Sequence, residues 1–172
     1  MFSICIFLAV SVQAILAGHE KELIKAIDDE KTHIQVAIYS FTNKRIADHL
    51  IKTHKKGVEV EVFVDPFSQT AGDAVDLLLK EGVPVYRYTP KEQRCWTSTC
   101  HHKFCTFESQ QGVWTGSYNF TYKAENSNRE NAVYIMGDKT SYEQFAREFD
   151  SLKAMGERLK VIEESPTIKN DG

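Results

Sequence analysis

The 172-residue sequence has few cysteines, no surplus of positive charge, and no repeat, linker or low-complexity block. Four cysteines are too few for a disulfide framework in a chain of this length. Lysine and arginine number 21 against 24 aspartates and glutamates, and this net charge of −3 disfavours nucleic-acid binding through a broad cationic surface. With 42% hydrophobic and 26% charged residues, the chain can bury one sizeable core, which excludes disorder, collagen and a multi-span membrane protein.

The N-terminal residues 1–17 are almost entirely apolar. Their length suits a signal peptide or membrane anchor, and Ala14 or Ala17 would be an acceptable cleavage site, although no lysine or arginine follows Met1. The alternative is that residues 10–14 form the first buried strand of the domain. The first interpretation predicts a secreted, periplasmic or membrane-associated protein, and the second a cytoplasmic one.

Strand and helix patterns alternate along the rest of the chain. The periodicity predicts helices over residues 19–30, 43–56, 70–81 and 141–159, and strands over residues 34–41, 58–64, 83–88, 103–107, 113–114 and 131–136. Short connections between these elements favour an α/β domain over residues 18–160, with a mixed, largely parallel sheet flanked by helices on both faces. A polar tail, residues 161–172, follows.

Four polar residues in the second half of the chain suggest chemistry on phosphorus. His101 and Lys103 are two residues apart in an expected strand, so both side chains point to one side. An imidazole beside a fixed ammonium can attack a phosphorus atom while the ammonium holds the non-bridging oxygens. Ser117 and Asn119 repeat this spacing on a neighbouring segment and can add neutral hydrogen-bond donors to the same anion.

The segment from His101 to Asn131 resembles the phospholipase D superfamily, whose signature is H-x-K-x4-D followed by G-S-x-N. The matching positions are His101, Lys103, Gly116, Ser117 and Asn119, with a further family-like run at Asn128-Arg129-Glu130-Asn131. The resemblance covers roughly residues 20–155 and is greatest to the small single-motif members, which are bacterial Nuc-type endonucleases and mitochondrial cardiolipin hydrolases. In this sequence Glu108 replaces the motif aspartate and the following turn is one residue longer. The N-terminal cysteine-rich element of the cardiolipin hydrolases has no counterpart.

This resemblance implies a phospholipase D-like α/β/α sandwich and a two-step mechanism without metal or cofactor. His101 is then the nucleophile that forms a phosphohistidine, Lys103 stabilises the phosphate, and Glu108 takes the place of the motif acid. Glu130 is expected to accept a hydrogen bond from His101, and Ser117 and Asn119 to support phosphate binding. A second histidine protonates the leaving group, and it must come from a second chain, so the resemblance implies a homodimer with His101 of both chains at the axis.

His102 and the cysteines admit other interpretations. His102 is expected to point to the opposite side of the strand from His101. Cys95 and Cys100 are close enough for a loop disulfide, and together with His101, His102 and Cys105 they could form a zinc cluster. Zinc sites of this kind carry a second ligand pair, which is missing here, so a disulfide or free thiols are favoured over structural zinc.

Two functions from different classes follow. The first is a phosphodiesterase that hydrolyses phospholipid or nucleic acid, and the second is a non-catalytic dimer that binds a phosphate, lipid or nucleic acid through a degenerate motif. The expected helix over residues 43–56 has a basic face that either is solvated or contacts a membrane surface or a phosphate backbone. That face consists of Lys44, Arg45, Lys52, Lys55 and Lys56.

Overall fold

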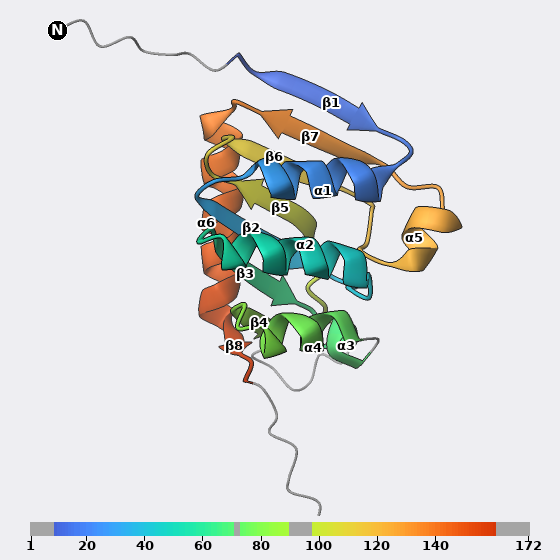
Figure 1. The fold of residues 1–172 in the computed structure, drawn as a ribbon, viewed down its shortest axis with the longest axis vertical. Coiled ribbons are helices and arrows are strands. Elements are labelled where there is room, and N and C mark those ends of the chain that lie inside the picture. The colour runs from blue at the N-terminus through green and yellow to red at the C-terminus, as the bar shows by residue number, and fades with distance from the viewer. Residues whose placement is uncertain (1–8, 71–72, 90–97, 161–172) are drawn as a thin grey trace, which may run out of the picture.

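The computed structural model describes residues 9–70, 73–89 and 98–160, which form one mixed sheet with helices on both faces (Figure 1). Within these ranges the sheet has eight strands in the order β1-β7-β6-β5-β2-β3-β4-β8. The strands are β1 (Ser11–Ile15), β2 (His33–Ile38), β3 (Glu59–Val64), β4 (Val85–Tyr88), β5 (Lys103–Phe107), β6 (Gly112–Gly116), β7 (Ala132–Met136) and β8 (Gly156–Arg158). The predicted α/β class is confirmed.

Parallel pairing occupies a smaller part of this sheet than the sequence predicts. Among the described strands, β2–β3 and β3–β4 are the parallel pairs, and the other five pairs are antiparallel. Parallel neighbours need a crossover, which α2 (Lys44–Lys55) and α4 (Asp73–Lys80) supply. The turn between β5 and β6 is too short for a crossover, so these strands form an antiparallel hairpin.

Two hydrophobic cores lie on opposite faces of the sheet. One core packs alternate residues of β2, such as Ile34 and Val36, against α1 (His19–Asp29), α2 and α4. The other is smaller and packs Ala37 and Phe104 against α6 (Lys139–Met155), which crosses the sheet behind the other helices in Figure 1. The period of two along each strand therefore decides which face a side chain reaches.

Side-chain caps fix where two of the helices begin. The Asn43 side chain accepts hydrogen bonds from the backbone N–H groups of Arg45 and Ile46, which confirms the predicted start of α2. Asp138 caps α6 in the same way, so this helix begins before the predicted residue 141. Two short helices were not predicted, namely α3 (Pro66–Thr70) and α5 (Tyr122–Asn126). The predicted helix over residues 141–159 is wrong at its end, because the backbone becomes extended at Gly156 and residues 156–158 form β8, which pairs with β4.

The N-terminal residues 11–15 form an edge strand of the sheet. β1 pairs with β7 in antiparallel register from Ser11 opposite Met136 to Ile15 opposite Ala132. Within β1 only Ile15 is buried, whereas the side chain of Val12 is 65% exposed. Residues 11–15 thus form an edge strand rather than the buried strand expected over residues 10–14. No helix in the described ranges is both long enough and apolar enough to span a bilayer.

Candidate active site

His101 and Lys103 lie together at the end of the sheet where β5 begins and β2 ends. The Lys103 Nζ lies 3.2 Å from His101 Nδ1 and 3.4 Å from Nε2, and it donates a hydrogen bond of 3.0 Å to the His101 carbonyl oxygen. The predicted same-side arrangement of these two residues is confirmed. His101 is exposed and Lys103 is half-buried, so the pair is open to a ligand.

Aromatic rings form one wall of this site. The centroid of the Tyr39 ring lies 4.4 Å from that of His101, and Lys103 Nζ lies 5.2 Å from the centre of the same ring. Phe67 of α3 stacks on Tyr39 at a centroid distance of 5.5 Å and is 53% exposed. Tyr39 and Phe67 thus form an aromatic wall beside the His101–Lys103 pair.

The buried carboxylate of Asp65 positions the segment that leads into His101. Its Oδ2 accepts a hydrogen bond of 2.8 Å from the backbone N–H of Cys100, and its Oδ1 accepts one of 2.9 Å from the N–H of Phe67. Asp65 therefore ties the residue before His101 to the start of α3. In the sequence, Asp65 stands out only as an aspartate directly after the apolar run of β3. No local pattern predicts its partner Cys100, which is 35 residues away.

Gly116 allows two backbone segments to approach closely at the end of β6. A Cβ atom on Gly116 would lie 2.2 Å from the carbonyl oxygen of Asn131. The next residue, Ser117, donates its N–H to that carbonyl at 2.9 Å, and its Oγ accepts a hydrogen bond of 3.0 Å from the N–H of Asn131. The glycine of the G-S-x-N motif is thus a steric requirement for placing Ser117 beside the start of β7.

The Glu130 carboxylate lies beside Ser117, but its hydrogen-bond partners differ from the expected partner, His101. Among the described residues it accepts hydrogen bonds from the Ser117 hydroxyl and from the Asn128 side chain, the latter at 2.8 Å, rather than from His101. Its charge reaches Lys103 nevertheless. Burial lowers the pKa of Lys103, and the Glu130 carboxylate opposes part of that shift. Asn119 lies nearby in sequence, and its buried Oδ1 has no hydrogen-bond partner among the described atoms.

Glu108 and His102 are placed away from this cluster. Glu108 follows the last residue of β5, at the opposite end of the strand from Lys103, and its N–H bonds to the carbonyl of His33. The structure therefore does not bring Glu108 together with His101. The His102 Nε2 lies 3.3 Å from Glu148 of α6, on the opposite face, as predicted.

The cysteines do not form a common metal site in the described part of the chain. Cys100 and Cys105 are both buried and free. Cys100 belongs to the core beneath α6, whereas Cys105 belongs to the core on the other face of the sheet. The suggested disulfide partner Cys95 lies outside the described residues.

A polar groove adjoins the site beside Glu130. Its volume is about 350 Å³, and its lining includes Arg129, Asn128 and Glu130 from the segment before β7 and Leu16 and His19 from the N-terminal side. The groove offers one cationic side chain, that of Arg129, and several hydrogen-bonding groups beside Glu130.

Comparison with known proteins gives the family. Residues 23–153 match the family described as cardiolipin synthase, PLD-like domain. The chain is 28% identical over 120 residues to the mitochondrial cardiolipin hydrolase of Chlamydomonas reinhardtii, covering 69% of this chain and 50% of that protein. It is 27% identical over 128 residues to the enzyme of the same name from Danio rerio, covering 74% of this chain and 53% of that protein. The chain thus spans about half the length of the curated relatives that it matches.

The solved structures agree with this assignment. Nuc from Salmonella typhimurium, a phospholipase D family member, superposes with a TM-score of 0.78 at 27% identity, over 88% of this chain and 99% of that one. The fold, the His101–Lys103 pair and the family match all cover the same region. The chain belongs to the PLD-like domain family, as a small member with a single H-x-K motif.

Proposed function

We propose that the protein is a phosphodiester hydrolase in which His101 is the nucleophile and Lys103 stabilises the charge on phosphate. The observation that carries this proposal is the 3.2 Å separation of Lys103 Nζ and His101 Nδ1 at an accessible end of the sheet. A phosphate that contacts both groups would have its phosphorus next to a nitrogen nucleophile and its non-bridging oxygens next to a cation.

The proposed reaction has two steps in which bonds and protons balance. An imidazole nitrogen of His101 attacks phosphorus, an N–P bond forms, and the bond to the leaving alcohol oxygen breaks as that oxygen takes a proton from an acid. Water then attacks the phosphohistidine, the N–P bond breaks, and the acid recovers its proton from the water. No step requires a metal ion, so EDTA is expected to leave the activity intact.

The acid in this proposal is His101 of a second chain. Within one chain the neighbouring His102 faces α6 and pairs with Glu148, so it is directed away from the site. A symmetric dimer would bring two His101 residues to one phosphate, one as nucleophile and one as acid. Glu130 then supports the site by holding Ser117 and by its charge near Lys103.

The substrate is a phosphodiester of a phospholipid or of a nucleic acid. The names of the cardiolipin hydrolase relatives support a phospholipid, and so does the net charge of −3, which provides no broad cationic surface. On the basic face of α2, Arg45 pairs with Glu20 and Lys55 pairs with Glu81, which reduces its charge further. The stacked Tyr39–Phe67 pair can contact either an acyl chain or a base.

A side-by-side assay separates these substrates. The purified chain in EDTA is incubated with cardiolipin or phosphatidylcholine vesicles, with single-stranded DNA and with RNA, at several salt concentrations. Turnover of vesicles with a flat salt response supports a lipid substrate, whereas activity on DNA or RNA that falls steeply with salt supports a nucleic acid. Strong inhibition by EDTA that zinc reverses, under conditions where EDTA leaves the Tm unchanged, would contradict the metal-free chemistry.

A covalent intermediate distinguishes the enzyme from a non-catalytic phosphate-binding dimer. The binding interpretation requires the Glu108 substitution to displace Lys103, yet Lys103 lies beside His101 and Glu108 lies at the other end of β5. Rapid quenching during turnover followed by mass spectrometry should find phosphate on His101 in the wild type and none in His101→Asn. Binding without any phosphohistidine would favour the non-catalytic dimer.

A further inference from the structure

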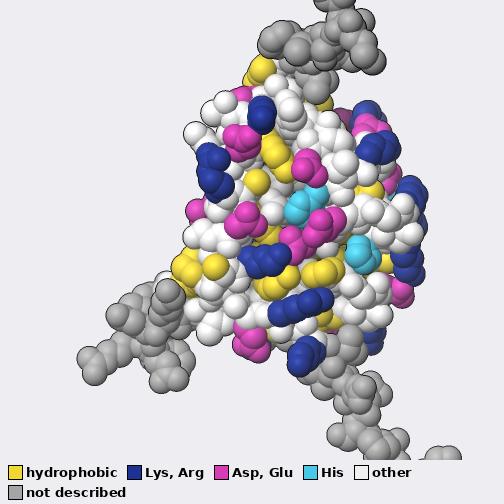
Figure 2. All heavy atoms as spheres, turned by 90° about the vertical axis from the view of Figure 1, so that its left-hand side faces the viewer, with side chains coloured by type: hydrophobic (Ala, Val, Ile, Leu, Met, Phe, Trp, Pro, Cys, Tyr) yellow, Lys and Arg dark blue, Asp and Glu magenta, His cyan; other side chains and the backbone are white. Residues whose placement is uncertain are grey.

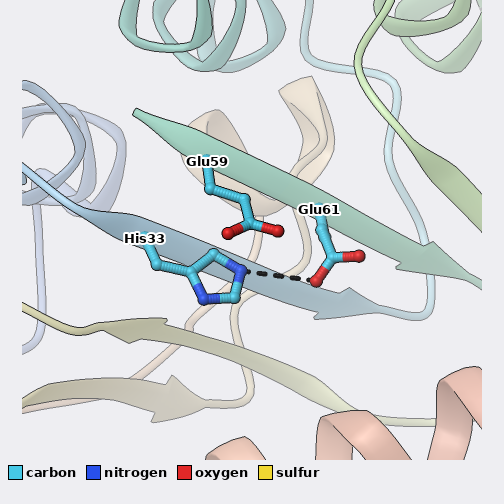
Figure 3. Close-up of side chains that lie close together, drawn as sticks. All are labelled: His33, Glu59 and Glu61. Atoms are coloured by element: carbon cyan, nitrogen blue, oxygen red, sulfur yellow. Dashed lines mark ion pairs between the residues drawn. The ribbon is translucent and has the colours of Figure 1, made fainter. Parts of the chain in front are cut away.

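A second cluster of polar side chains lies at the end of the sheet opposite to His101. His33 and Glu59 are the first residues of β2 and β3 and are register partners in this parallel pair, and Gln35 and Glu61 are the next partners on the same face. Figure 3 shows the side chains of His33, Glu59 and Glu61 converging from the two neighbouring strands. They lie on the face of the sheet that α6 covers in part.

The donor atoms of this cluster are close enough to share one metal ion. The donor atoms of His33, Glu59 and Glu61 all lie within 4.8 Å of one another. His33 Nε2 lies 3.3 Å from Glu61 Oε2, yet it is buried and has no hydrogen-bond partner in the described part of the chain. A charge-assisted N–H···O bond would measure about 2.7–2.9 Å. Two ligands bound at about 2.0–2.2 Å to a tetrahedral zinc ion lie about 3.3–3.5 Å apart.

The Glu61 carboxylate is held in place from its other side. Glu61 is buried, and its Oε1 accepts a hydrogen bond of 3.2 Å from the Tyr86 hydroxyl and one from Lys153 of α6. These contacts leave Oε2 directed toward His33. Because one carboxylate oxygen is occupied by β4 and α6, the other is preorganised as a ligand without further movement of the backbone.

The charges around the cluster favour a cation. The carboxylates of Glu59, Glu61 and Glu108 all act on His33, and the ammonium of Lys153 offsets one of them. Figure 2, which faces the left-hand side of Figure 1, shows acidic side chains beside the histidines on this face of the molecule. Glu59 is exposed, so its side chain can rotate toward an incoming ion.

We propose that His33, Glu59 and Glu61 bind one divalent transition-metal ion, with zinc the best match. One imidazole and two carboxylates are a ligand set that zinc accepts, and water would complete the coordination. The site is separate from His101, so its role is structural. The ion would join the first residues of β2 and β3 and, through Glu61 and Lys153, connect them to α6.

Zinc binding to the full chain tests this proposal directly. Calorimetric titration of the metal-free protein with ZnCl₂ should give one ion per chain, and zinc should raise the Tm. His33→Gln and Glu59→Gln should each weaken binding by about tenfold or more and abolish most of the Tm increase. Glu59 is exposed, so Glu59→Gln is expected to fold like the wild type, which far-ultraviolet circular dichroism checks.

Two control variants show whether the ion binds at this cluster. His49 forms a pair with Asp28 at 2.8 Å but has no second carboxylate partner among the described residues, so His49→Gln should leave zinc affinity unchanged. His102→Gln removes the histidine that pairs with Glu148 and should also have no effect. The proposal is overturned if the wild type binds no zinc, or if both His33→Gln and Glu59→Gln retain its full affinity.

Discussion

Removal of the Lys103 ammonium should lower the rate of reaction more than it lowers the stability of the fold. Lys103→Ala is expected to lower kcat by about 100-fold or more, because one donor to a developing anion contributes about 3 kcal/mol. Lys103 is half-buried and its Nζ binds the His101 carbonyl, so the Tm should be measured beside the rate. Lys80→Ala, at an exposed lysine of α4 outside the basic face of α2, is the control, and an equal loss of rate in both variants would contradict the assignment.

Removal of the nucleophile should cost more than removal of any supporting group. We expect His101→Asn to have less than about 1% of the wild-type rate on any phosphodiester substrate, because losing a nucleophile costs several orders of magnitude. Glu108→Ala should keep a rate close to that of the wild type, since Glu108 lies beyond the far end of β5. Steady-state rates of both variants at saturating substrate check this. A collapse of the rate in Glu108→Ala would show that the far end of β5 is coupled to the site.

The sequence predicts the chemistry at this site better than its geometry. His101 precedes β5, which begins at Lys103, yet the two-residue spacing still places the two side chains together, as the local pattern predicts. The contacts of Asp65 with Cys100 and of Tyr39 with His101 depend on how distant segments meet, so no local pattern reveals them. Glu130 illustrates the same limit, since its position was found from the motif but its partner was not.

At the scale of elements, the connection between α1, β2 and the β5–β6 turn depends on one buried carboxylate. Glu30 Oε1 accepts hydrogen bonds of 2.9 Å from the N–H groups of Lys31, Thr32 and Ser109, and its Oε2 accepts one of 3.2 Å from the Gln110 side chain. Burial alone would raise the pKa of Glu30, but the hydrogen bonds from Ser109 and Thr32 lower it to about 2.

This pKa predicts how stability depends on pH. The pKa of Glu30 is lower in the folded state than in the unfolded state, so its contribution is present in full above about pH 4.5 and is lost as the pH falls toward 2. Glu30→Gln should lower the free energy of unfolding by about 2–3 kcal/mol at pH 7 and flatten its pH dependence between these limits. Urea denaturation from pH 7 to pH 2 measures this. Asp76→Asn on the exposed face of α4 serves as the control and should show the wild-type slope.

The close contact between Gly116 and Asn131 predicts that a side chain at position 116 destabilises the end of β6. Gly116→Ala should destabilise the protein by about 2–3 kcal/mol and disturb Ser117, because the new Cβ would meet backbone atoms of Asn131 that cannot move aside. Gly112 lies at the other end of β6 and faces the end of the Tyr134 side chain at 3.1 Å, so Gly112→Ala is the milder control. Equal unfolding free energies for the two variants would contradict this account.

Helices and strands of ordinary length were predictable, whereas the short ones were not. The Asn43 cap and the spacing of apolar residues identify α2 from local sequence alone. α5 has five residues and β8 has three, which is too short for a periodic pattern, and both form only because the neighbouring chain positions them. The extent of parallel pairing was overestimated because pairing partners depend on the path of the whole chain.

At the scale of the whole molecule, the proposed dimer can be tested by mixing chains. If each site needs His101 from two chains, an equimolar mixture of wild type and His101→Asn should lose about half of its activity per wild-type chain once subunits exchange at random. Lys80→Ala chains mixed in the same ratio should leave the activity per chain unchanged. Full activity in a strictly monomeric fraction, identified by analytical ultracentrifugation, would show that one chain supplies both the nucleophile and the acid.

The pairing of β1 with β7 has a consequence for how the domain folds. Residues 11–15 and 132–136 come from opposite ends of the domain, so this edge of the sheet closes only when nearly the whole chain between them is in place. Contacts between such distant segments form slowly. Until they form, β7 presents unpaired backbone groups that can associate with other chains. The yield of refolding should therefore fall as protein concentration rises. The protein that fails to refold should be recovered as aggregates rather than as unfolded monomers.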